Sequence, residues 1–477
     1  MALILLGAYA LLIAWTAFSG KKQSADAFYV NERASGALGV GFSILVSCVG
    51  ASATIGMIGM AFVVGTPAFW WLGAGAVGLA ALSLFLARKV RKSEAYTLPH
   101  MAETFLGKQT RPLMAAIIVA AWSAILAAQF SALIAVLGPL TGFGSQACLA
   151  IGFLLVCGHT LGGQSAIMRV DRLQALVILT ALGMTLVWLS LHNPGWTGAF
   201  RLEIVNAAFP LEKLRYDPLA GGANYLVCPM LFGRFFSARD EKSAVAGGLL
   251  GASGIAVCSV LIVAVGLACR GLLPEDTAPD AVLTRILAEV MPSWMHLVVS
   301  LALVSAIVSS ADSCLVTAAT VCGNDLFKTR NPTVARRCVL ALGIFGALVS
   351  VCGKGILGFL LMAYDIFACG VVAPCFVGLM LLPGRRIQGN FACAAVISGG
   401  LLGLAAALTE NSLYSYLGMG LSSLLALAGA RKRAGIAACD FFGEPLLVET
   451  HGGRGPDVGN ARPLLEESGK GHVSAGS

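Results

Sequence analysis

The chain has 477 residues, of which 57% are hydrophobic and 12% are charged, and its mean hydropathy is +0.84. This balance excludes a soluble protein of this length and predicts an all-α polytopic membrane protein. The net charge of +8 is modest, so it indicates basic loops at a membrane face and no nucleic-acid partner. The 14 Cys and 6 His form no CxxC or HExxH motif, so we expect no cofactor and no enzyme site.

Apolar segments long enough to cross a bilayer occur about thirteen times. They lie at 2–19, 36–62, 67–87, 112–138, 145–165, 169–191, 219–237, 243–268, 293–321, 335–352, 354–381, 390–408 and 412–430. Lys21 and Lys22 follow the first segment and no basic residue precedes it, which predicts an uncleaved span with the N-terminus outside. Most Lys and Arg then fall in cytoplasmic segments of a multi-pass plasma-membrane protein. We expect a transmembrane domain over residues 1–433 and a disordered cytoplasmic tail over 434–477.

Two of the expected spans contain glycines or a proline that would interrupt a helix. Residues 36–62 include FSILVSCVGASATIGMIGMAF, and residues 219–237 include GGANYLVCPMLFGRFF. These spans are five helices apart, so 36–191 and 219–381 would form two five-helix repeats, the second inverted relative to the first. A break frees backbone carbonyls that can bind a cation. For either segment alone, ordinary helix packing through glycine is the alternative.

The ninth expected span, with the sequence VSAIVSSADSCLVTAATV, places adjacent hydroxyls inside an apolar helix. Buried polar groups are rare in membranes, and hydroxyl and carbonyl oxygens suit a hard cation such as Na⁺. If this span crosses the first break, the ligands would be the carbonyls of Val46, Val49 and Ala306 and the hydroxyls of Ser309 and Ser310. The alternative is that the hydroxyls only bond carbonyls one turn back.

Six segments, in chain order, resemble motifs of the solute:sodium symporter family, closest to its proline and pantothenate branch. They are GKKQSADAFYVNERASGALG, GASATIGMIG, YTLPHMAETFLG, HTLGGQSAIMRVDRLQ, CPMLFGRFFSARDEKSAVAG and AIVSSADSCLVTAATVCGNDLFK. The resemblance covers about residues 1–430. It implies a LeuT-like fold with a 5+5 inverted repeat, and uptake of a small organic solute coupled to Na⁺ by alternating access.

The resemblance also implies roles for individual residues. It places the Na⁺ site on the five ligands above, and a second cation site or an exit path on Asp171, Asp312 and Ser313. For Asp171, a carboxylate at a helix N-terminus near basic residues is the alternative. Cys48 stands where the proline branch has a carboxylate, so any role of that acid is absent. Ala53 stands where the sugar branch has an amide, which argues against a sugar, and we expect an amino acid or a carboxylate rather than a sugar.

A solute pocket would lie between the two breaks and the third span. The candidates are Ser52, Ala53, Thr54, Phe69, Trp70, Trp71 and Tyr225. Trp70 and Trp71 would equally suit an aromatic belt at the membrane surface. Two other functions remain open, a H⁺-coupled carrier of the same fold and a membrane sensor that does not transport.

Overall fold

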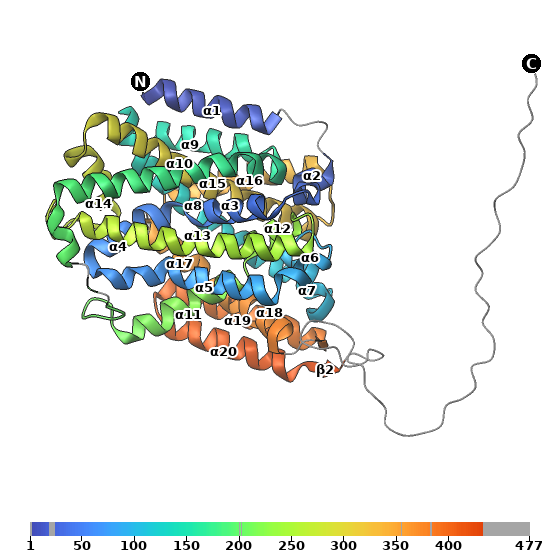
Figure 1. The fold of residues 1–477 in the computed structure, drawn as a ribbon. Helices are drawn as coiled ribbons and strands as arrows, with labels where there is room; N and C mark the ends of the chain where they lie inside the picture. The colour runs from blue at the N-terminus through green and yellow to red at the C-terminus, as the bar shows by residue number, and fades with distance from the viewer. Residues whose placement is uncertain are drawn as a thin grey trace, which may run out of the picture.

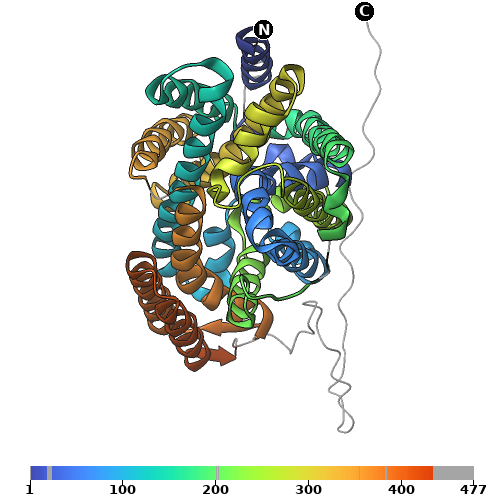
Figure 2. The same cartoon turned by 90° about the vertical axis from the view of Figure 1, so that its left-hand side faces the viewer.

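The protein is described by a computed structural model that covers residues 2–18, 24–199, 201, 203–353, 355–381 and 384–432. The expected tail, 434–477, lies outside the described residues. The described chain is a bundle of helices that run roughly side by side (Figure 1). Figure 2, turned by 90°, looks along many of them and shows α1 and the pair α19–α20 at the edges of the bundle.

Twenty α-helices make up most of the described chain. They are α1 (Ala2–Phe18), α2 (Ala25–Val30), α3 (Ala37–Cys48), α4 (Met57–Val64), α5 (Phe69–Phe85), α6 (Ala87–Lys92), α7 (Leu98–Leu106), α8 (Thr110–Thr141), α9 (Ser145–Thr160), α10 (Gly163–His192), α11 (Leu211–Leu226), α12 (Pro229–Phe236), α13 (Glu241–Ala268), α14 (Val282–Arg285), α15 (Ser293–Val321), α16 (Pro332–Ser350), α17 (Gly355–Phe367), α18 (Ala373–Phe376), α19 (Gly389–Thr409) and α20 (Ser412–Ala428).

Shorter elements join or extend these helices. The 3₁₀ turns are η1 (Asn31–Arg33), η3 (Thr66–Ala68), η4 (Pro194–Ala199) and η5 (Pro279–Ala281), and the π-helical turns are η2 (Ser52–Gly56), η6 (Ile286–Val290), η7 (Cys322–Leu326), η8 (Ala368–Val372) and η9 (Val377–Leu381). Two short strands, β1 (Arg385–Ile387) and β2 (Ala430–Lys432), pair antiparallel. They join the chain before α19 to the chain after α20.

By length and composition, eight described helices can cross a membrane, or nine if the bent pair formed by α3 and the η2–α4 segment counts as one span. Three shorter apolar helices, at Ala2–Thr16, Ser145–Thr160 and Ser412–Ala428, lie at other expected spans. The polytopic all-α prediction is confirmed, whereas the number thirteen stays a prediction. The expected span 219–237 is divided between α11 and α12.

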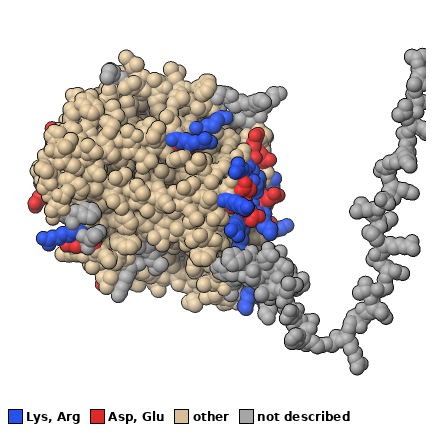
Figure 3. Space-filling view, viewed as in Figure 1, with Lys and Arg blue, Asp and Glu red and all other residues tan. Residues whose placement is uncertain are grey.

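Charged side chains gather at the two ends of the bundle. Figure 3 shows a broad band of uncharged surface between them, with the densest cluster of Lys, Arg, Asp and Glu at the end where α2, α6 and α7 lie. Large hydrophobic side chains such as Leu11, Leu173 and Leu401 are exposed between these ends. Lipid tails are the environment that such a surface suits.

Close helix contacts depend on residues without a side chain. The helices α3 and α13 pack directly against each other. A Cβ atom added at Gly41 would lie 2.9 Å from Leu250 Cβ, and one added at Gly251 would lie 2.6 Å from Ile44 Cγ2. The two helices therefore approach more closely than larger residues would permit. This contact fixes the first half of the broken span against the rest of the bundle.

Candidate cation and solute site

The first break lies in the second expected span, between α3 and the π-helical turn η2. The chain leaves the helix at Val49 (φ −95°, ψ 66°), and the two halves of the span meet at an angle of 61°. A Cβ atom at Gly50 would lie 2.3 Å from the Ser310 hydroxyl oxygen. Only glycine therefore lets the break approach α15 this closely, and it brings freed carbonyls to the hydroxyls of α15.

The Ser310 hydroxyl reaches across to the end of α3. Its oxygen lies 3.0 Å from the carbonyl oxygen of Ser47 and 3.3 Å from that of Val46. Val46, Val49, Ala306 and Ser310 are all buried. The hydroxyl thus bonds carbonyls on another helix, so oxygen atoms from α3 and α15 lie close together, and oxygen ligands are those that a hard cation prefers.

A glutamine on α8 forms a hydrogen bond with the backbone at the break. The carbonyl oxygen of the Gln129 side chain accepts a hydrogen bond from the Ala51 backbone N–H at 3.1 Å. The Gly50 carbonyl is occupied by Thr54, whose hydroxyl donates to it at 2.8 Å. The Ala51 N–H and the Gly50 carbonyl, both at the break, therefore have hydrogen-bond partners within the protein. Sequence reasoning missed Gln129, although a Gln inside the long apolar α8 is the signal that marks it.

Ser309 faces a different group from Ser310. Its hydroxyl lies 3.3 Å from Asp171 Oδ1, and the Ser43 hydroxyl donates to Asp171 Oδ2. Asp171 is completely buried, on α10. The carboxylate is therefore satisfied by hydroxyls from α3 and α15 and joins three helices beside the break.

Asp312 makes its side-chain hydrogen bonds to residues other than those that contact Asp171. Its Oδ2 is 2.5 Å from His159 Nδ1, and the Thr160 hydroxyl donates to its Oδ1 at 3.0 Å. His159 and Asp312 are both buried. The sequence motif HTLGG contains this histidine, but the contact joins residues 153 positions apart, so the sequence did not pair them.

A buried arginine links α12 to α3 and α15. Nη2 of Arg234, on α12, donates to the Ser47 hydroxyl at 2.9 Å and to the Ser313 hydroxyl at 2.5 Å. Only 1% of Arg234 is exposed. Its signal in the sequence is a lone basic residue inside the apolar run CPMLFGRFF. The guanidinium brings one positive charge to the region that holds the carboxylates.

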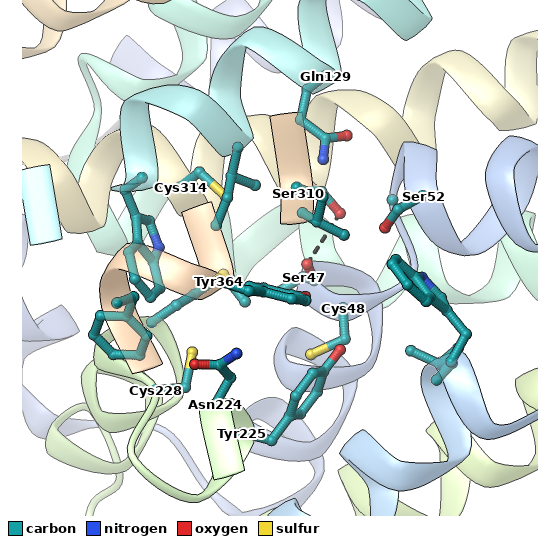
Figure 4. Close-up of a pocket in the computed structure, with 18 residues that line it drawn as sticks. Ser47, Cys48, Ser52, Gln129, Asn224, Tyr225, Cys228, Ser310, Cys314 and Tyr364 are labelled. Carbon is teal, nitrogen blue, oxygen red and sulfur yellow. Dashed lines mark hydrogen bonds between the residues drawn. The ribbon is translucent and has the colours of Figure 1, made fainter. Parts of the chain in front are cut away.

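A cavity of about 70 Å³ lies between the two breaks (Figure 4). Its lining residues are Ser47, Cys48, Gly50, Ser52, Trp71, Leu72, Trp122, Ile125, Gln129, Asn224, Tyr225, Cys228, Met230, Ser310, Cys314, Leu360, Tyr364 and Phe367. The second break forms one wall, because α11 ends at Leu226 and α12 starts at Pro229 after the extended Cys228 (φ −84°, ψ 118°). The cavity thus borders both breaks and the Ser310 hydroxyl.

The expected pocket residues divide between this cavity and other places. Ser52, Trp71 and Tyr225 line it, and Figure 4 places the Tyr225 hydroxyl beside the Cys48 thiol. Thr54 lines a separate small cavity of about 20 Å³, while Phe69 and Trp70 line a pocket near Glu203. Ala53 is buried and is not among the lining residues of these three cavities.

Among the described residues, no group of three or more His, Cys, Asp or Glu side chains is arranged to hold a metal ion. The site consists instead of a broken helix, neutral oxygens and a small cavity in the interior of a membrane bundle. These features define a cation-coupled secondary transporter.

Comparisons with known proteins agree with this class. The model of the sodium:solute symporter family matches residues 28–383, and the chain belongs to this family. The protein is therefore a Na⁺-coupled secondary transporter and not an enzyme, with Na⁺ as its coupling ion. A comparison with curated proteins found no match.

Two solved structures share the fold at low sequence identity. A Na⁺-coupled sialic acid symporter, in a substrate-bound outward-open state, has a TM-score of 0.77 and 15% identity, with 91% of this chain and 99% of that chain covered. Mhp1, a nucleobase-cation-symport-1 family transporter in a closed conformation with bromovinylhydantoin bound, has a TM-score of 0.55 and 15% identity, with 86% and 95% covered. Both likenesses support the LeuT-like fold.

Proposed function

We propose that Na⁺ binds between the first break and α15. The ligands would be the carbonyls of Val46, Val49 and Ala306 and the hydroxyls of Ser309 and Ser310. The proposal is carried by the Ser310 hydroxyl, which lies within 3.3 Å of a carbonyl at the end of α3. Five neutral oxygens suit Na⁺, whereas a transition metal would require His or Cys ligands.

Ser309 extends the proposed site toward Asp171. A carboxylate beside the Na⁺ ligands favours a cation electrostatically, and the Arg234 guanidinium on Ser47 and Ser313 limits how much further positive charge the region accepts. Asp171, Asp312 and Ser313 remain proposed as a second cation site or an exit path. Asp312 pairs with the ionisable His159, whereas Asp171 is hydrogen-bonded to neutral hydroxyls and one of these belongs to the proposed ligand Ser309, so Asp171 is the stronger candidate of the two acids.

The proposed cycle is alternating access in a plasma membrane, with the N-terminus outside and the C-terminus in the cytoplasm. Na⁺ enters from outside, joins the break to α15 and fixes the wall of the adjacent cavity, so that a small organic solute binds more tightly. The coupling is reciprocal, because the solute must then tighten Na⁺ binding by the same factor. The membrane potential contributes about 2.3 kcal/mol per charge per 100 mV. The end with the dense cluster of charges, near α2 and α6, would face the cytoplasm.

Replacing both hydroxyls, Ser309→Ala with Ser310→Ala, tests the Na⁺ site. The double variant should lose Na⁺-stimulated uptake and Na⁺-dependent thermal stabilisation while remaining folded. Ser300→Ala is the matched control, because Ser300 is also buried on α15 but lies more than two turns away. Normal Na⁺-dependent uptake by the double variant would refute the assignment.

The same measurements separate the other two functions. Uptake by the unaltered protein that follows pH and ignores Na⁺ would indicate the H⁺-coupled carrier. Binding of a solute without any net movement across the bilayer would indicate the sensor.

A further inference from the structure

The cavity between the breaks contains two buried side chains whose polar atoms are unpaired. Asn224 is 4% exposed, and within the described part of the chain neither its amide nitrogen nor its amide oxygen has a hydrogen-bond partner. Trp122 is also 4% exposed, and its indole Nε1 has no partner among the described residues. Buried polar groups are nearly always hydrogen-bonded to protein or to water, and these two side chains line one cavity, where a bound solute can supply the missing partners.

The unpaired atoms specify what the ligand must carry. The Asn224 side chain presents a donor and an acceptor side by side, and an N–H next to a C=O is the edge that complements it. Trp122 offers one further donor, which requires an acceptor. Gln129 uses its carbonyl oxygen for the Ala51 N–H, and its amide nitrogen is a further donor that it can offer to the cavity.

The walls favour a flat and uncharged molecule. Five aromatic side chains line the cavity, namely Trp71, Trp122, Tyr225, Tyr364 and Phe367. Aromatic faces contact planar groups over a large area. Among the described lining residues, none is Lys, Arg, His, Asp or Glu. A cationic solute would therefore lose its hydration without a side chain of opposite charge in the wall, and an anionic solute would find only the proposed Na⁺ beside Ser310, so desolvation favours a neutral solute.

The cavity also limits the size of the solute. Its volume of about 70 Å³ is roughly half of the 150 Å³ that accommodates benzene in an engineered cavity. A molecule with one small ring fits after modest side-chain movement, whereas a disaccharide or a fused ring system would need a much larger expansion.

We propose that the transported solute is a small, planar, uncharged molecule with an amide edge, either a ureide or a lactam with at most one ring. This inference rests on the Na⁺ site proposed above and names the solute class that the same transporter carries. The sequence favoured an amino acid or a carboxylate. The unpaired Asn224 amide and the uncharged walls favour a neutral amide instead.

Thermal unfolding of the purified full-length protein tests the solute class. We would compare uracil, hydantoin and urea with proline, pyruvate and glucose, in NaCl and in choline chloride at equal ionic strength. At least one of the three amides should raise the unfolding temperature in NaCl, because a ligand that binds the folded state stabilises it. Stabilisation by proline or pyruvate alone, or by none of the three amides, overturns the proposed solute class.

Two conservative variants test the contacts. Asn224→Leu keeps a similar size without adding charge but loses the amide donor and acceptor, and Trp122→Phe keeps an aromatic ring but loses the indole N–H. Each should weaken amide binding roughly tenfold or more, as expected for at least one lost hydrogen bond in a buried site. Trp294→Phe is the control and should bind normally, because Trp294 is 57% exposed on α15. Unchanged amide binding by both cavity variants overturns the proposed contacts.

The outcomes distinguish this inference from the proposed function. If Na⁺ stabilises the protein but only a charged solute adds to it, Na⁺ coupling stands and the neutral amide fails. If an amide stabilises equally in choline chloride and in NaCl, the solute class stands and Na⁺ coupling fails.

Discussion

Replacing Gly50 by alanine would place a methyl group in contact with the proposed Na⁺ site. The added Cβ would lie 2.3 Å from the Ser310 hydroxyl oxygen and 3.0 Å from the Gln129 amide oxygen, where ordinary contact begins at 3.4 Å. The break and α15 must therefore separate by about 1 Å, a shift that overpacking of a tight interior produces. This separation moves the Ser310 hydroxyl away from the Val46 carbonyl.

The expected loss follows from the contacts that this movement breaks. An interaction between a charged group and a polar partner contributes about 1.5–3 kcal/mol, so Gly50→Ala should weaken Na⁺ binding by about ten- to a hundredfold. The assay is the midpoint of a NaCl titration, read as the rise in unfolding temperature with choline chloride as the balancing salt.

Gly56→Ala is the matched control for this variant. Gly56 lies in the same interrupted span, but the nearest atoms to its added Cβ would all belong to the Leu357 side chain, with Cδ2 at 3.0 Å and Cγ at 3.4 Å. That side chain can rotate away, so Na⁺ binding should be nearly unchanged. If folded Gly50→Ala protein binds Na⁺ as tightly as the unaltered protein, Ser310 is not a ligand and the assignment of the break fails.

Three further predictions concern side chains at the end of the bundle near α7. Asp325→Ala breaks the contact from Arg111 Nε to Asp325 Oδ1 at 2.7 Å and should lower the free energy of unfolding by about 2 kcal/mol, less than a fully buried pair loses because Arg111 is 19% exposed. A loss below 0.5 kcal/mol in denaturant titrations would contradict this. Burial and the nearby Arg111 charge lower the pKa of His100, so the unfolded state binds its proton more readily. Stability should therefore fall as the pH drops below the unfolded pKa of about 6.5, and His100→Gln should reduce that fall in unfolding temperatures measured at pH 7.5 and 5.5. Tyr96→Phe loses only the hydroxyl that donates to Asp26 at 2.6 Å, whereas Tyr96→Leu also removes the ring whose centroid lies 4.2 Å from the Arg330 guanidinium. Tyr96→Leu should therefore be about 0.5–1 kcal/mol less stable than Tyr96→Phe, and equal unfolding temperatures of the two variants would exclude this contribution.

The sequence predicted the parts of the fold that depend on local patterns. Apolar length identified the helices, and the glycine and proline runs marked both breaks. The first break occurs at Val49 and Gly50, and the second occurs immediately before Pro229. These features could be predicted because a helix needs apolar length to cross lipid, and because clustered glycines or a proline within a span are the usual sign of an interrupted helix.

The contacts inside the site could not be predicted in the same way. Asp171 and Asp312 look alike in the sequence, yet one is held by hydroxyls and the other by His159. Trp71 and Trp70 are adjacent, but only Trp71 lines the cavity because successive residues of a helix face different directions. Which neighbour a side chain meets depends on helices more than a hundred residues away.

The tight contact between α3 and α13 also affects how a mutational survey of this protein would be interpreted. Positions 41 and 251 lie on a face where the two helices leave no room for a side chain. Almost any substitution there should reduce the amount of folded transporter in the membrane, and an uptake screen would report these positions as strongly as it reports Ser310. Uptake divided by the amount of folded protein would separate the two groups. Protein altered on this face should transport normally for each molecule that folds, whereas protein altered at Ser310 should not.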